Sequence, residues 1–88
     1  MSPRLSVSVD LSFPVVPPGH FLGCDVALPG ARMGDVVLIV EPSSRPPGLS
    51  VFAFVRSPGW VGVCCKNKTG EYPISASTGT YKLTILNQ

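Results

Sequence analysis

The residues with reactive side chains in this chain are one histidine, His20, three cysteines and five carboxylates. A catalytic centre or a metal site needs several such groups to converge on one point. Cys64 and Cys65 are adjacent, and neighbouring side chains of a strand point to opposite faces, so the two thiols suit neither a mutual disulfide nor one tetrahedral metal. No CxxC or HxxxH spacing occurs. We therefore expect no catalytic residue, no metal site and no cofactor.

A covalent mechanism would require Cys64 or Cys65 as the nucleophile and His20 as its base. A free cysteine is more often a small core residue, and one thiol of the adjacent pair fits that description. The acids follow no paired motif; they are Asp10, Asp25, Asp35, Glu41 and Glu71. The triplet "NKT" at 67–69 matches a glycosylation acceptor, but this pattern is common by chance and we expect no secretory leader. We predict that the chain is not an enzyme and that its thiols stay reduced in a cytoplasm.

Charged residues are scarce, at 14% of 88 residues, whereas 44% are hydrophobic. About 25% is usual for a soluble domain, so we expect part of the surface to face another protein. The net charge of +2 arises from seven basic and five acidic residues scattered along the chain. Nucleic-acid binding needs a basic stripe that neutralises several phosphates, and a membrane span needs about 18 apolar residues in a row. We expect neither nucleic acid nor membrane as a partner.

Any active group would have to be positioned by β-strands, because glycine and proline divide the chain into short β-branched and aromatic segments. No window shows the apolar spacing of an amphipathic helix. We predict an all-β fold, a small antiparallel β-sandwich or β-barrel of six to seven short strands without a long helix, as a single domain over 1–88. In "SPGW" at 57–60, proline and glycine in the central positions favour a type II turn joining two strands as a hairpin. The expected strands are 5–13, 20–28, 35–41, 49–56, 60–66 and 80–86.

Two of these strands are apolar on both faces, unlike the regular apolar–polar alternation of 5–13. In 35–41, Val37 and Ile39 oppose a second apolar row, and in 49–56 the second row holds Phe52 and Phe54. Burying such a side chain is worth about 1.5–3 kcal/mol, and an exposed patch of them invites association. We predict that Val37, Ile39, Phe52, Phe54 and Trp60 form an interface with another subunit. The alternative is a barrel or curled sandwich in which loops such as 14–19 shield these residues.

Trp60 follows the Pro-Gly turn and suits either of two roles. It can cap one end of the core, or it can serve as an interface anchor or sugar platform. Phe21 and Tyr72 also stand beside turns. Grouped on one exposed rim, the three rings would instead indicate a receptor- or carbohydrate-binding module.

An ordered series of short motifs runs through residues 28–86, about two thirds of the chain. It resembles a small β-sandwich module of tailed-bacteriophage virion structural proteins. In that family a "GA" turn and a "GD" pair open a β-branched strand, a "PP" loop follows, and a "TGTY"-type strand closes the module. The matching residues here are Gly30, Ala31, Gly34, Asp35, Pro46, Pro47, Gly48, Leu49, Val61, Val63, Asn67, Thr69, Gly70, Thr78, Gly79, Thr80 and Tyr81.

The resemblance implies a non-enzymatic virion structural protein, specifically a capsid decoration or cement protein. Its partner would be the major capsid protein or another virion protein, and it would form a homo-oligomer, with a trimer favoured. It would be made in the cytoplasm of the host bacterium and reside on the capsid surface of the virion. The alternative, a receptor- or carbohydrate-binding module of a phage tail or head fibre, depends on Trp60, Phe21 and Tyr72 lying together.

Overall fold

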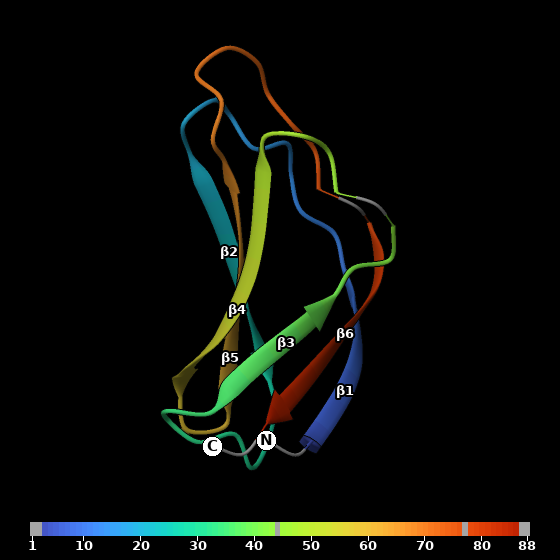
Figure 1. Cartoon of the computed structure of the whole chain (residues 1–88), viewed down its shortest axis with the longest axis vertical. Helices are drawn as coiled ribbons and strands as arrows, with labels where there is room; N and C mark the ends of the chain where they lie inside the picture. Colours follow the sequence, from blue (N-terminus) through green and yellow to red (C-terminus); the bar gives the residue numbers. More distant parts are fainter. Residues whose placement is uncertain (1–2, 44, 77, 87–88) are drawn as a thin grey trace.

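The structure is a computed structural model that describes residues 3–43, 45–76 and 78–86, and every regular element within those ranges is a β-strand. The strands form two three-stranded antiparallel sheets with the orders β1–β6–β3 and β2–β5–β4 (Figure 1). The predicted small β-sandwich is therefore confirmed. The strands are β1 (Pro3–Leu11), β2 (Phe21–Ala27), β3 (Val36–Val40), β4 (Leu49–Ser57), β5 (Trp60–Asn67) and β6 (Gly79–Leu86).

Each of the six ranges expected from the sequence overlaps one strand, because glycine and proline interrupt the β-branched segments. The largest difference is at β1, which begins and ends two residues earlier than the expected 5–13. The predicted hairpin joins β4 to β5, with Ser57 paired to Trp60. Gly59 has a φ of 81°, which the third position of a type II turn requires and which glycine adopts without a steric penalty.

The core lies between the sheets and is best sealed beneath the two central strands. The inward-facing side chains of β5 and of β6, the central strands of the two sheets, are fully buried. The inward row of the edge strand β1 packs against the same core but stays half-buried. Burial therefore decreases from the centre of the first sheet towards its β1 edge. The fully buried side chains of the central strands are Val61, Val63, Cys65, Tyr81, Leu83 and Ile85.

The face assigned to β3 from the sequence is wrong. Val37 and Ile39 pack against the core, while Leu38 and Val40 are 50% and 60% exposed. Because both rows of this strand are apolar, alternation alone could not tell inside from outside. Pairing with β6 decides it, since Ile39 lies opposite the buried Leu83 and directly opposed residues share a face of the sheet.

The proline-rich connection between β1 and β2 closes one end of the sandwich. Val16 within it is completely buried and forms an isolated bridge with Ile74. Phe13, just before it, contacts Tyr81 edge-to-face with ring centroids 6.2 Å apart. This loop therefore covers the end of the core. It does not shield the outward rings of β4, as the alternative prediction from the sequence required.

Candidate functional site

The outward row of β4 presents two aromatic rings to solvent. Phe52 and Phe54 are 45% and 43% exposed, and their rings stack with centroids 6.4 Å apart and planes inclined by 23°. They lie opposite Cys64 and Gly62 of β5. We call Phe52, Phe54, Cys64 and Gly62 the outer patch. Two of the five predicted interface residues thus sit together on one open sheet face.

Gly62 determines how the ring of Phe54 lies. A Cβ built at Gly62 would come within 3.1 Å of Phe54 Cζ, so the ring rests directly on the backbone of β5. A larger residue at this position would have to displace the ring. The glycine opposite Phe54 therefore lets this ring lie against the sheet instead of projecting from it.

An ion pair borders the outer patch on the same face. Arg56 Nη1 of β4 donates hydrogen bonds of 2.9 and 3.0 Å to Oδ1 and Oδ2 of Asp25 on β2, across the intervening β5. Both side chains are largely exposed, so the pair contributes less than about 1 kcal/mol to stability. An apolar centre with a polar rim is the usual layout of a protein interface.

Trp60 also lies on this face of β5, at the hairpin end, and is 47% exposed. Phe21 lies at the other end of the sheet: Trp60 pairs with Ala27, whereas Phe21 pairs with Lys66, six positions along β5. At about 3.3 Å per residue, the two rings are roughly 20 Å apart along the strand. Tyr72 sits near Phe21's end, where its carbonyl accepts a hydrogen bond from Asn67. The three aromatics do not share a rim, which contradicts the arrangement that a sugar-binding module required.

The three cysteines are free and lie on different faces: Cys24 and Cys65 point inward and Cys64 outward. Burial raises the pKa of the Cys64 thiol, and Asp25 raises it further while Arg56 acts in the opposite direction. Desolvation likewise raises the pKa of Cys24 and of Cys65. Protonated thiols are weak nucleophiles at neutral pH. The ring of His20 contacts the carbonyl of Pro18 through Nδ1 at 3.0 Å.

Four of the five carboxylates are engaged with separate partners. Asp10 accepts a hydrogen bond from Thr80, and the other three pair with arginines. In the described ranges no three His, Cys, Asp or Glu side chains are placed to hold a metal ion. Those ranges likewise contain no helix suited to crossing a membrane. The ion pairs are Arg4–Asp35, Arg45–Glu41 and Arg56–Asp25.

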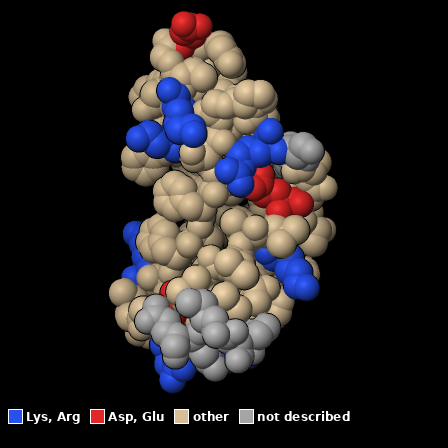
Figure 2. Space-filling model, viewed as in Figure 1, with Lys and Arg blue, Asp and Glu red and all other residues tan. Residues whose placement is uncertain are grey.

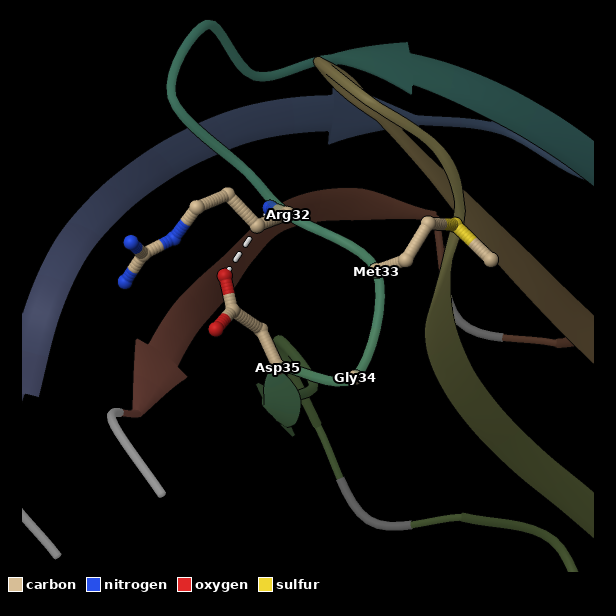
Figure 3. A pocket seen from close by; sticks show the side chains of 4 residues that line it. All are labelled: Arg32, Met33, Gly34 and Asp35. Atoms are coloured by element: carbon tan, nitrogen blue, oxygen red, sulfur yellow. Dashed lines mark hydrogen bonds between the residues drawn. The ribbon is translucent and has the colours of Figure 1, made fainter.

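A shallow hollow lies at the β2–β3 loop, lined by Arg32, Met33, Gly34 and Asp35 (Figure 3). The turn closes on itself: Arg32 N–H donates to Asp35 Oδ2 at 2.9 Å, and Asp35 N–H donates to the Arg32 carbonyl at 3.1 Å. The guanidinium of Arg32 extends away from the carboxylate (Figure 3). Since the carboxylate already serves the turn, this hollow offers little to a ligand.

Asn67, the first residue of the "NKT" triplet, is fully buried. Its Nδ2 donates to the carbonyls of Val16 and Tyr72 at 3.0 and 2.9 Å. Its Oδ1 accepts from the backbone N–H and the hydroxyl of Thr69 at 2.9 and 2.7 Å. This amide ties together the loops that close one end of the sandwich and is not accessible as a glycosylation acceptor. The burial of Asn67 follows from the alternation of β5, because Asn67 continues the inward row after Cys65.

Charge is sparse on the face seen in Figure 2. The charged atoms form small groups there, one of them with basic and acidic atoms in contact, and broad areas of other residues divide these groups, with no continuous basic stripe on that face. Among the described residues, the outer patch combines two adjacent exposed aromatic rings with a polar border, and we take it as the candidate surface for contact with another protein.

No protein-family model matches the chain, and neither a curated protein nor a solved structure matches it. The site therefore rests on the geometry of the described residues. The phage-module resemblance of residues 28–86 stays a prediction from the sequence.

Proposed function

We propose that this chain is a non-enzymatic structural protein of a tailed-bacteriophage virion, a capsid decoration protein that binds the major capsid protein shell and stabilises it. The observation that carries the proposal is the outer patch. Phe52 and Phe54 remain 45% and 43% exposed on a strand whose other row already fills the core. Adjacent phenylalanine rings in water forgo hydrophobic stabilisation that a partner surface would supply.

Two further features support this function. The outer patch lies within residues 28–86, which resemble the phage module, and the Arg56–Asp25 pair gives it the polar border of an interface. Free thiols with raised pKa values, such as that of Cys64, suit a protein made in a reducing host cytoplasm. In the virion the protein would sit on the outer surface of the capsid.

The size of the patch explains why such a protein would act as a homo-oligomer. Covering the exposed half of each ring contributes about 1 kcal/mol, which is modest for a single copy. An oligomer that presents several patches to a regular lattice converts later contacts into intramolecular ones and binds far more tightly. We therefore include homo-oligomer formation in the proposal.

Co-sedimentation of the purified chain with shells of the major capsid protein of the same phage tests this function. The natural chain should pellet with the shells and raise the temperature at which they come apart. The variant Phe52→Ser/Phe54→Ser should bind at least tenfold more weakly, because two rings at about 1 kcal/mol each exceed the 1.4 kcal/mol of a tenfold change.

The matched control is Leu38→Ser/Val40→Ser, which removes two exposed apolar side chains from the other sheet. It should bind shells like the natural chain, and circular dichroism should show both variants folded. Failure of the natural chain to bind would refute the function. An equal loss in both variants would refute the assignment of the outer patch.

A further inference from the structure

Two glycines lie inside strands on the outward face of the β2–β5–β4 sheet, Gly62 in β5 and Gly23 in β2. Neither has a left-handed φ, in contrast to Gly59, so the backbone at both positions would accept a residue with a side chain. A glycine weakens the interior of a strand and often marks a place where another group approaches closely. The reason for these two glycines therefore lies in what covers them.

Gly62 is buried although it faces outward, because the ring of Phe54 lies over it. A Cβ at Gly62 would stand 3.1 Å from Cζ of that ring, and 3.4 and 3.5 Å from Cε1 and Cε2. The first of these distances is shorter than an optimal contact between two carbon atoms. An added methyl group would therefore lift the ring away from the sheet, and a side chain branched at Cβ would lift it further.

Other outward side chains of this face also lie over the sheet. A Cβ at Gly23 would stand 2.9 Å from Sγ of Cys64, so the thiol of β5 leans over the glycine of β2. Arg56 of β4 reaches Asp25 of β2 across β5. Together with the Phe54 ring, these side chains all lean from the β4 side towards β2, and the face has a low profile.

The low position of the Phe54 ring keeps both rings of the outer patch available at the same time. Phe54 is 43% exposed and Phe52 is 45% exposed, and the two ring planes differ by only 23°. A partner surface can then contact both rings at once. A lifted Phe54 ring would meet the partner first and hold it away from Phe52.

We propose that Gly62 is a positioning residue for shell binding, which keeps the outer patch low enough for a flat apolar surface of the major capsid protein to pack on both rings. The inference rests on the proposed function and deepens it by naming the kind of surface that the partner presents. Because Gly62 is buried beneath the ring, it acts through Phe54. Its effect on binding should therefore depend on that ring.

Stability and binding should respond in different ways to a side chain at position 62. If the fold itself required glycine there, any larger residue would lower the stability of the chain. If the glycine serves binding, valine should leave the stability unchanged or raise it, because valine is favoured in strands. The same substitution should weaken binding, which is the pattern expected where function is maintained at a cost in stability.

Co-sedimentation of the full chain with shells of the major capsid protein, together with urea unfolding, tests the inference. Gly62→Val should bind shells about fivefold more weakly than the natural chain, the change equivalent to the contribution of one ring, with a urea midpoint that is no lower. In a Phe54→Ser background, Gly62→Val should weaken binding no further, because no ring is left to displace. The control Ser8→Val, at an exposed strand position of the other sheet, should bind like the natural chain.

Gly62→Ala, whose single methyl group moves the ring less, should fall between the natural chain and Gly62→Val in binding. Unchanged shell binding by Gly62→Val overturns the inference, as does an equal loss with and without the Phe54 ring. A lowered urea midpoint or an unfolded variant also overturns it, because the fold would then require the glycine. These results leave the proposed function standing. Failure of the natural chain to bind shells refutes the proposed function, and the positioning role falls with it.

Discussion

Asp35 connects the first strand to the β2–β3 turn. Its Oδ2 accepts a hydrogen bond of 2.9 Å from the Arg32 N–H, and the same carboxylate pairs with Arg4 of β1. The Arg32 hydrogen bond lowers the pKa of Asp35, and the Arg4 guanidinium lowers it further. At the scale of residues, one carboxylate therefore secures the β2–β3 turn and joins it to β1.

The variant Asp35→Asn should unfold more easily than the natural chain at neutral pH, and this difference should shrink on acidification. Because the pKa of Asp35 is lowered by folding, the carboxylate stabilises the fold above its unfolded pKa of about 4. That contribution disappears as the pH falls through the folded-state pKa. Urea midpoints at neutral and acidic pH measure the effect.

Glu71→Gln, in an exposed loop, removes one negative charge without touching the turn and serves as the control. It should leave the midpoint nearly unchanged at neutral pH. A loss of stability in Asp35→Asn that persists undiminished at acidic pH would contradict the role given to the ionised carboxylate.

Among the elements, the β4–β5 hairpin matters most because it carries the outer patch. Its turn depends on Gly59, whose φ of 81° is costly for any residue with a Cβ. The turn sets the register that places Phe54 over Gly62. A change at the turn therefore acts on the geometry of the patch as well as on stability.

We expect Gly59→Ala to lower the free energy of unfolding by about 1 kcal/mol, the strain of a left-handed non-glycine residue. No atom lies within 4 Å of the added methyl group, so the loss would come from the backbone and not from a clash. Chemical denaturation measures it. Gly70→Ala, which has equally open surroundings and no left-handed φ, should change stability little. Equal effects of the two substitutions would argue against turn strain.

At the scale of the whole molecule, the sandwich is closed at one end by a loop and left open along one edge. Val16 supplies the closure: its N–H donates to the Ile74 carbonyl at 2.8 Å, its carbonyl accepts from the Ile74 N–H at 3.1 Å, and its side chain is fully buried. The open edge is β1, where the inward row is half-buried. The stability of the fold therefore depends on this loop as well as on the two sheets.

Val16→Ala should destabilise the protein by about 2 kcal/mol, from the loss of two buried methyl groups and the space they leave. Val15→Ala, one residue earlier and 53% exposed, is the matched control and should cost only a small fraction of that. Thermal and urea unfolding of both variants would measure the difference. Similar losses would show that the loop does not seal the core.

The sequence by itself determined the number and kind of the strands and their limits to within two residues, because these follow from local preferences and from glycine and proline between the segments. For β4 the prediction that Phe52 and Phe54 face outward is confirmed, and Ser50 and Arg56 continue the same row at both ends of the strand. β3 has no polar residue in either row to mark its outer face.

Only the tertiary structure decided the features that depend on contacts between distant segments. Pairing with β6 turned Val37 and Ile39 inward, and the bridge to Ile74 buried Val16. The β2–β5 ladder set Phe21 and Trp60 at opposite ends of one sheet. Local patterns do not encode these outcomes, because the face of an apolar strand and the position of a loop are fixed by whichever segment packs against them.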